Sequence, residues 1–383
     1  MLEYYIWLQL CLGAGSNKVK TILSHYKTPQ AVFRADNKSR TASKLFTKKQ
    51  LELMQTVPLS KALGVLACCR ENNIGIITID SKKYPYCLSV IDNPPLILYY
   101  KGKFPDFDTV PSVCIVGPRK VSDFGKRAAY SLGYRLSKSG ITVVSGGAVG
   151  TDTYAHSGAL KADCKTVLVM GCGILHDYLP ENKKLREAVC QKGCIISEHP
   201  PKFPVTKGAF PTRNRILSAL CLGTIVVEAP QRSGALITAR YACEQGRDVF
   251  VIPGEPNKPE YKGSNSLLRD GAKPLLDTSD IFNEYILRFP DKINIETAYS
   301  KPIIEKREKE TEKFEKIEKK LNIPLSKEAQ MVYNSLNKQK FIPEDLSFLG
   351  LSSGELLSAL TELEMEFIIK ALPGGMYEVC KND

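Results

Sequence analysis

Short runs of Val, Ile and other apolar residues alternate with amphipathic segments through the middle of the chain. The runs have strand length and occupy residues 112–117, 141–145, 166–170, 194–197, 224–228 and 248–252. The intervening segments carry apolar residues at helical spacing, at residues 124–139, 152–160, 182–190, 212–220 and 235–245. Near-continuous apolar strands separated by helices are typical of a parallel sheet covered on both faces. The pattern therefore predicts an α/β fold with an extended, doubly wound, Rossmann-like sheet.

Residues 1–62 differ from this region because their apolar positions recur at helical spacing throughout. They predict a small helical domain, SAM-like or helix-hairpin-helix-like, with a turn at Gly13-Ala14-Gly15. In a helix-hairpin-helix the amides of such a turn can hold a DNA phosphate, but a plain tight turn is favoured here. Residues 75–79 and 94–100 predict strands at the near edge of the main domain, which is expected to span residues 63–292.

The C-terminal part has a third pattern. Residues 293–320 are rich in Lys and Glu, as in a solvated linker or an exposed helix. Residues 321–383 contain three helical segments and a β-hairpin, which together predict a winged-helix domain. The last helix carries acidic side chains that would repel phosphates, so a protein contact or a vestigial role is favoured there. These acids are Glu355, Glu362, Glu364 and Glu366.

Composition narrows the class of partner. Hydrophobic residues make up 43% and charged residues 25% of the 383 residues, and the formal net charge is +12. An excess of cations favours an anionic partner such as nucleic acid. No apolar run could span a bilayer and no signal peptide is evident, so a cytoplasmic protein without a membrane partner is expected. The 12 cysteines and 4 histidines are scattered, so neither a metal nor a cofactor is expected.

The stretch from Lys207 to Arg215 combines cations with an aromatic ring. Thr212 is a plausible N-cap for the following helix, which would place Arg213 and Arg215 in the first turn. Cations there oppose the helix dipole by roughly 0.3–1 kcal/mol each, unless an anion shares the space with the free amides. Phe210 could stack on a base, and cations with aromatic rings are the chemistry of single-stranded nucleic-acid binding. Alternatively, Phe210 is core and the arginines pair with neighbouring acids.

Three further segments follow predicted strands and combine small residues with polar ones. They are residues 117–122, 145–152 and 228–234. Parallel strands end at one edge of a sheet, where ligands of doubly wound folds bind. Small residues let the backbone approach a ligand, and consecutive amides can bind an anion. Each segment alone could be an ordinary turn, but their common position predicts one binding site.

The most specific motifs lie between Val113 and Ala272. They are residues 117–119 with Ser122, 143–148, 150–152, 155–156, 197–198, 210–216, 226–229, 233–239, 246–247, 251–254, 263–265 and 271–272. Together these motifs resemble the bacterial DNA-processing protein A (DprA/Smf) family. The resemblance covers the chain and is weaker at both ends. Two positions depart from the family's pattern: Pro118 replaces a serine, which removes a hydroxyl and a backbone donor, and Gly147 replaces a leucine.

The resemblance implies a protein that is not an enzyme and binds single-stranded DNA. Such proteins protect incoming strands during natural transformation (competence) and load a RecA-type recombinase onto them. A homodimer formed through the Rossmann-like domain is also expected. The family's phosphate-binding arginine falls on Arg119 beside Ser122, its basic residue and stacking ring on Lys207 and Phe210, and its amide contacts around Ser145, Gly146 and Gly147. With neighbouring positions, the predicted DNA-binding set is Gly117, Arg119, Ser122, Ser145, Gly146, Gly147, Lys207, Phe210, Arg213, Asn214, Arg215, Ser233 and Gly234.

An enzyme is the alternative from a different class. Related Rossmann-like glycosidases of the lysine-decarboxylase-like type cleave nucleoside monophosphates, and Glu228 or Asp152 could act as acid or base. Those enzymes carry a Pro-Gly-Gly-x-Gly-Thr stretch and a later Glu, and the turn at residues 145–147 lacks both the proline and the acid. A helix cap or an internal ion pair is the favoured role for both carboxylates. His156, among apolar helical neighbours, is expected to be structural.

Overall fold

The computed structural model of the protein describes residues 1–206, 208–294, 326–336, 340–365, 368–372 and 376–379. Contacts divide the chain into two compact units, Met1–Glu305 and Lys306–Asp383. Each unit is described by itself. The predicted linker at residues 293–320 lies almost entirely outside the described residues.

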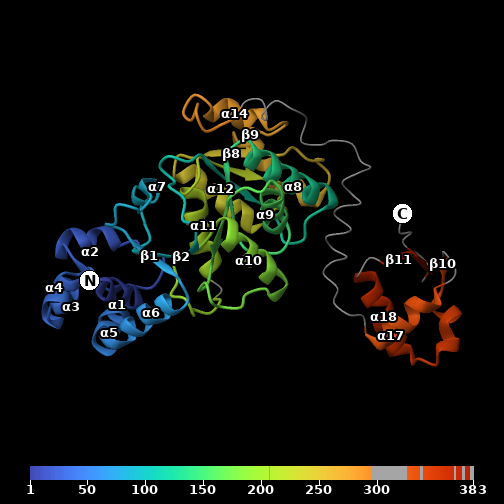
Figure 1. Ribbon diagram of the computed structural model, residues 1–383, viewed down its shortest axis with the longest axis horizontal. Coiled ribbons are helices and arrows are strands. Elements are labelled where there is room, and N and C mark those ends of the chain that lie inside the picture. The colour runs from blue at the N-terminus through green and yellow to red at the C-terminus, as the bar shows by residue number, and fades with distance from the viewer. Residues whose placement is uncertain (207, 295–325, 337–339, 366–367, 373–375, 380–383) are drawn as a thin grey trace. The chain divides into compact units, whose positions relative to one another are not determined.

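Within the described residues, the first unit is built on a nine-stranded sheet with the order β1-β2-β6-β5-β4-β3-β7-β8-β9 (Figure 1). The strands from β3 to β9 run parallel to one another, whereas β2 is antiparallel to both β1 and β6. The strands are β1 Gly75–Thr78, β2 Ile97–Gly102, β3 Ser112–Val116, β4 Thr142–Ser145, β5 Thr166–Met170, β6 Cys194–Ser197, β7 Gly223–Val226, β8 Asp248–Val251 and β9 Lys273–Pro274.

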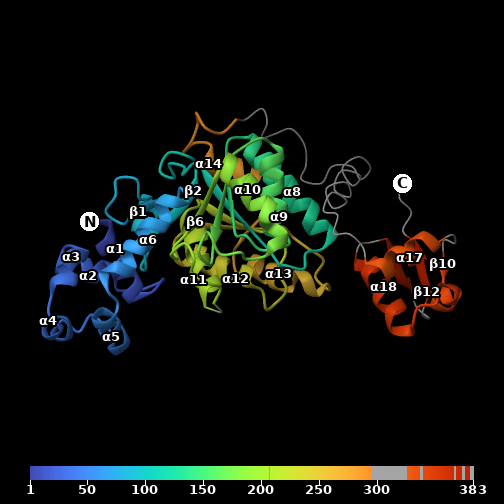
Figure 2. The same ribbon diagram turned by 60° about the horizontal axis from the view of Figure 1, so that its bottom comes forward.

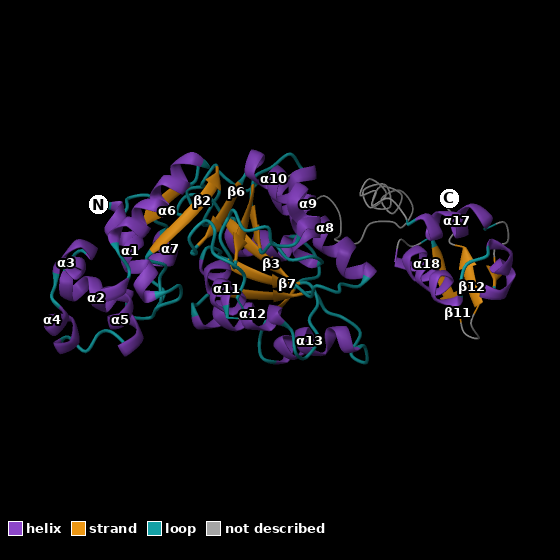
Figure 3. Cartoon of the chain, turned by 90° about the horizontal axis from the view of Figure 1, so that it is seen from below, coloured by secondary structure: helices purple, strands orange, loops and turns teal. Residues whose placement is uncertain are grey.

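Helices cover both faces of this sheet, as Figures 2 and 3 show. In β3, Val113 and Ile115 join a core with α8, α9 and α14, while Cys114 and Val116 join a core with α11 and α12 on the other face. This alternation follows from the two-residue period of a strand. The helices are α7 Tyr86–Ser89, α8 Asp123–Lys138, α9 Thr151–Lys161, α10 Lys183–Lys192, α11 Ala209–Ala219, α12 Gly234–Glu244, α13 Lys262–Arg269 and α14 Ser279–Tyr285, with 3-10 turns at Pro180–Asn182 and Pro259–Tyr261. The doubly wound sheet predicted from the sequence is confirmed.

The N-terminal helices pack beside the β1–β2 end of the sheet (Figure 1). They are α1 Leu2–Leu12, α2 Val19–Tyr26, α3 Pro29–Arg34, α4 Asn37–Ala42, α5 Lys48–Thr56 and α6 Leu59–Glu71. Trp7 and Ile22 belong to the same buried cluster as Tyr99 of β2 and Leu168 of β5. The helical segment and the sheet therefore share a core. The boundary predicted at residue 62 lies inside α6.

The second unit contains two α-helices, a 3-10 helix and a small antiparallel sheet of order β10-β12-β11 among its described residues. Its elements are α17 Lys327–Ser335, β10 Lys340–Phe341, η3 Pro343–Leu349, α18 Ser353–Met365, β11 Ile369–Leu372 and β12 Met376–Val379. Val332, Leu346 and Leu360 lie in its own buried cluster. The sequence did not predict β10. One of the three predicted helical segments is the 3-10 helix η3. The winged-helix assignment stays a prediction.

The order of the strands reverses beside β3. The chain passes from β3 to its neighbour β4, and β7, much later in the sequence, pairs with the other side of β3. The connections after β3 and β7 therefore leave the sheet in opposite directions. In open α/β sheets a crevice forms at such a point, outside the carboxyl ends of the strands.

Candidate nucleic-acid interface

Three side chains from separate segments meet at the carboxyl edge of the sheet. Arg119 follows β3, Tyr178 lies in the loop after β5, and Phe210 lies in the first turn of α11. The guanidinium carbon of Arg119 lies 5.4 Å from the centre of the Phe210 ring, and Arg119 Nη2 donates to the Tyr178 hydroxyl at 3.1 Å. The two rings are tilted with centres 5.3 Å apart. We call Arg119, Tyr178 and Phe210 the edge cluster.

The edge cluster has the chemistry of a single-strand contact. Arg119 is exposed and has no ion-pair partner among the described residues, and both rings are partly exposed. Burial raises the pKa of the Tyr178 hydroxyl, and the charge of Arg119 opposes this rise. The hydroxyl therefore stays protonated and can act as a hydrogen-bond donor. A free cation beside stackable rings suits an unpaired polynucleotide.

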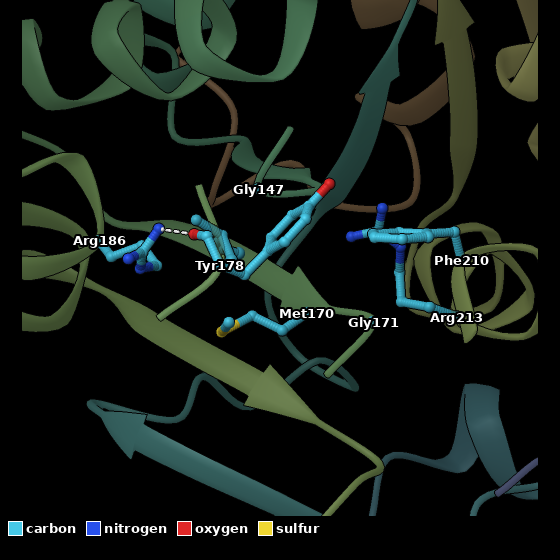
Figure 4. A pocket seen from close by; sticks show the side chains of 8 residues that line it. Gly147, Met170, Gly171, Tyr178, Arg186, Phe210 and Arg213 are labelled. Carbon is cyan, nitrogen blue, oxygen red and sulfur yellow. Dashed lines mark hydrogen bonds between the residues drawn. The ribbon is translucent and has the colours of Figure 1, made fainter. Parts of the chain in front are cut away.

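A small pocket lies beneath the rings (Figure 4). It is lined by Gly147, Leu168, Met170, Gly171, Tyr178, Arg186, Phe210 and Arg213. Its volume of about 10 Å³ suffices for roughly one water molecule. The pocket is therefore too small to admit a nucleic-acid base.

Arg186 of α10 holds the loop that carries Tyr178. Its guanidinium donates to the main-chain oxygen of Tyr178 (Figure 4). It also donates to the main-chain oxygen of Leu179 at 2.9 Å and pairs with Asp177 at 3.1 Å. The sequence reading missed Tyr178. A tyrosine after the third parallel strand was a signal of the same kind as Phe210, but no cation stands next to it in the sequence.

The helix that carries Phe210 begins upstream of its predicted start. α11 starts at Ala209 with Gly208 at the N-cap, and Thr212 Oγ1 donates to Gly208 O at 2.9 Å from inside the helix. The prediction that Thr212 caps the helix, with Arg213 and Arg215 in its first turn, is wrong. Pro211 explains the error, because proline is tolerated in a first turn and was taken as a residue before the helix.

Arg213, Asn214 and Arg215 point into the protein, each with less than a tenth of its surface exposed. Arg215 pairs with Glu198 at 2.7 Å and is 1% exposed. Arg213 donates to Val169 O and to Asn214 Oδ1, and Asn214 Nδ2 donates to Gly234 O at 3.4 Å. The structure assigns these three side chains to the core, because each is buried and bonds to groups inside the protein, in place of the DNA contacts predicted for them.

Two predicted serines are also engaged internally. Ser122 donates from both its amide and its hydroxyl to the Glu228 carboxylate, at 2.7 and 2.6 Å, and its hydroxyl accepts from Gly125 N at 3.0 Å. Ser145 is fully buried and donates to Ile115 O at 2.7 Å. Both hydroxyls therefore form hydrogen bonds within the protein. The structure gives them this role in place of the direct phosphate contact predicted for them.

The glycines after β4 line the base of the site. Gly147 faces the pocket, and its carbonyl accepts from Asn182 at 3.2 Å. At Gly146, an added Cβ would lie 2.4 Å from Asp152 Oδ2, so a larger residue there would have to displace this carboxylate. Burial raises the pKa of the Asp152 carboxyl, and the nearby Arg213 guanidinium opposes part of the rise.

Gly117, Ser233 and Gly234, three other predicted positions, also follow strands of the sheet. Gly117 is partly exposed and packs against Thr151, and Ser233 caps α12 by accepting from Ala235 N at 3.3 Å. Gly234 is exposed at the start of that helix. Lys207 lies outside the described residues.

The two carboxylates considered for catalysis are buried. Glu228 is 0% exposed and holds Ser122, and Asp152 is 8% exposed and accepts from Ala148 N at 3.2 Å. His156 is also 0% exposed, with its ring nitrogens 2.8 Å from Thr166 Oγ1 and from Gly146 O, which confirms the structural role expected for it. In the described part of the chain, no group of His, Cys, Asp and Glu is arranged to hold a metal ion.

Residues 75–286, more than half of the chain, match the family described as DNA recombination-mediator protein A. The chain belongs to this family. The DNA processing protein DprA of Bacillus subtilis is 40% identical over 233 residues, which cover 61% of this chain and 78% of that protein. Protein Smf of Escherichia coli is 30% identical over 285 residues, covering 73% and 75% of the two chains. These matches confirm the resemblance read from the sequence.

Solved structures of the family share the fold. DNA processing protein A from Streptococcus pneumoniae superposes with a TM-score of 0.64 at 30% identity, over 74% of this chain and 98% of that one. The Helicobacter pylori protein superposes with a TM-score of 0.51 at 30% identity, over 56% and 96% of the two chains. That structure was described for a single-stranded DNA binding mode. None of the helices in the described residues is long and apolar enough to cross a lipid bilayer.

Proposed function

We propose that this protein binds single-stranded DNA at the carboxyl edge of its sheet, largely without sequence preference. The observation that carries the proposal is the edge cluster, in which an unpaired cation adjoins two stackable rings. Stacking and phosphate contacts read no base edges, so sequence preference should be weak. Gly117, Gly147, Lys207, Ser233 and Gly234 are proposed as further contacts along the strand.

The direct test is a fluorescence-anisotropy titration with a labelled oligothymidine and a duplex of equal length. Phe210→Ala should weaken single-strand binding by roughly 1–3 kcal/mol, the contribution of one stacked base. Tyr86→Ala, which removes an exposed ring on α7 outside the cluster, is the matched control and should bind like the wild type. Equal affinity of wild type and Phe210→Ala would remove the edge cluster from the site.

We further propose the role that the family resemblance implies: protection of incoming strands and loading of a RecA-type recombinase in the cytoplasm during natural transformation. Adding the protein to single strands coated with a single-strand-binding protein should shorten the lag before recombinase-driven strand exchange. The Arg119→Ala variant should leave this lag as long as it is without added protein. A lag that is equally long with and without the wild-type protein would contradict the loading role.

A homodimer through the Rossmann-like domain is part of the same proposal. Light scattering coupled to size exclusion should give twice the chain mass of 42.5 kDa. A mass of one chain across micromolar concentrations would contradict it.

We propose that the protein acts as a mediator and not as an enzyme. Burial of Glu228 and Asp152 supports this, because the Glu228 carboxylate is held by Ser122 and the Asp152 carboxylate by the Ala148 amide. Incubation with nucleoside monophosphates should release no ribose phosphate. Turnover that scales with protein concentration and disappears in Glu228→Gln would favour the glycosidase alternative.

A further inference from the structure

The turn between α1 and α2 contacts the segment that leads to Phe210. Gly15 N donates to Glu198 Oε1 at 3.0 Å, and the same oxygen accepts from Arg215 of α11 at 2.7 Å. Glu198 and Arg215 are 5% and 1% exposed, so their ion pair is buried, and the bond from Gly15 is partly buried. The amide of Gly15, which could have held a phosphate in a helix-hairpin-helix, is thus occupied by a protein carboxylate.

Gly15 also packs directly against the first turn of α11. Its φ is +74°, and a Cβ added there would lie 2.5 Å from Cγ2 of Thr212. Thr212 cannot simply rotate away, because it is β-branched and its hydroxyl donates to Gly208 O at 2.9 Å. Phe210 lies in the same helical turn. A displacement of Thr212 therefore displaces the ring.

A second contact from α1 holds the start of the same segment. Gln9 is 4% exposed, and its Nε2 donates to the main-chain oxygen of Glu198 at 2.6 Å. Its Oε1 accepts from the Tyr99 hydroxyl of β2 at 2.8 Å, which fixes the orientation of the amide. The end of β6 is thus fastened to α1 as well as to the turn.

The segment between β6 and α11 also holds the loop that carries Tyr178. Gly173 N donates to Phe203 O at 2.9 Å, and Leu175 N donates to Pro201 O at 2.8 Å. The contacts therefore run from α1 and its turn to both rings of the edge cluster.

We propose that the α1–α2 turn is a positioning element of the single-strand site, which sets the place of Phe210 without touching DNA. This inference rests on the proposed function. Stacking depends on the ring face meeting the base, so a shift of the first turn of α11 weakens binding although every cation remains. The N-terminal helices then affect binding indirectly, through contacts in the protein interior.

The test compares two glycines of one turn in the full-length chain. Gly15→Ala should weaken oligothymidine binding by about fivefold or more, the lower range for one stacked base, with an unchanged salt dependence. Gly13→Ala is the matched control: Gly13 has a φ of +79° and nothing within 4 Å of an added Cβ, so it places a side chain at positive φ in the same turn without the clash. It should bind like the wild type.

Thr212→Ser supplies the rescue, because it deletes the clashing methyl group and keeps the hydroxyl bonded to Gly208. The double variant Gly15→Ala/Thr212→Ser should recover wild-type affinity, and Thr212→Ser alone should bind normally. Thermal melting checks that each variant is folded. If Gly15→Ala does not fold, the double variant decides: it must fold and bind like the wild type, and a failure of either kind contradicts the inference.

The outcomes separate this inference from the function beneath it. Binding that is insensitive to Phe210→Ala overturns the proposed site itself. Binding that is sensitive to Phe210→Ala, but equal in Gly15→Ala and Gly13→Ala, overturns the positioning role alone.

Discussion

Arg119 and Arg215 show how location decides the role of a side chain. Arg119 is exposed beside two rings, whereas Arg215 is 1% exposed and pairs with Glu198. Removing one partner of a buried ion pair typically costs about 3–5 kcal/mol, because the other charge is left uncompensated. An exposed cation makes little difference to stability. Arg119 is therefore available for binding, and Arg215 serves the fold.

Replacing these arginines should have opposite consequences. Arg119→Ala should reduce the slope of log affinity against log salt by about 0.7, the value for one phosphate contact with a single strand, and leave the melting temperature unchanged. Arg215→Ala should lower the melting temperature. Anisotropy titrations at several salt concentrations and thermal melts measure the two effects. An unchanged slope in Arg119→Ala would show that this guanidinium contacts no phosphate.

His156 makes the stability of the fold depend on pH. Burial lowers its pKa from 6.5 to about 4, against an opposing hydrogen bond to the Gly146 carbonyl. Since the unfolded chain takes up the proton first, the contribution of the neutral ring is complete above about pH 6.5 and is lost as pH falls towards 4. Over that window the unfolding free energy should fall by up to about 3 kcal/mol more in the wild type than in His156→Gln. Urea titrations across this pH range measure the difference, and parallel pH profiles would contradict it.

At the scale of elements, Glu228 joins the end of β7 to the start of α8. Its carboxylate accepts from the amide and the hydroxyl of Ser122, the N-cap of α8. A carboxylate at a helix N-terminus is stabilised by the helix dipole. A DNA phosphate at the same N-terminus would meet this negative charge. The anion site at this edge is therefore expected at Arg119, in the loop that Glu228 anchors.

Removing this anchor should affect both stability and binding. Glu228→Ala should destabilise the protein by about 1.5–3 kcal/mol, the range for a hydrogen bond to a charged group. It should also weaken single-strand binding, because the loop that holds Arg119 loses its attachment. Glu228→Gln should have smaller effects, since its amide oxygen still accepts from Ser122 N. Chemical denaturation and anisotropy measure the two quantities, and wild-type stability in Glu228→Ala would argue against the anchor.

At the scale of the whole molecule, the chain forms two units with separate cores. In the second unit the acids of α18 face local partners: Glu355 accepts from Ser352, and Glu362 accepts from Ser326. Their negative charges do not favour a polynucleotide. The predicted cations and rings of the site all belong to the first unit.

A chain that ends at Glu305 should therefore bind single-stranded DNA like the full-length protein. The reason is that the truncation leaves the edge cluster and the N-terminal helices in place. Anisotropy titrations of the two chains at matched salt provide the comparison. A weaker affinity or a smaller salt slope in the shorter chain would place DNA contacts in the second unit.

The sequence by itself determined the architecture of the main domain and two members of the edge cluster. β5 and β6 occupy the predicted residues, because a strand buried on both faces must be apolar along its whole length, and that property is local. Arg119 was found because it stands in a segment that follows a strand, and parallel strands end at one edge. Phe210 was found because cations flank its ring in the sequence.

Only the tertiary structure decided which polar residues face solvent. The family's motifs include Arg213, Arg215 and Ser122 as well as Arg119. In the fold, however, Arg213 donates to Val169, Arg215 to Glu198 and Ser122 to Glu228, and all three partners are distant in sequence. Likewise, Tyr178 joins Phe210, and Gly15 reaches Glu198, through contacts that no local pattern encodes. Propensity and periodicity act over a few neighbours, whereas burial and pairing depend on where the folded chain brings distant residues together.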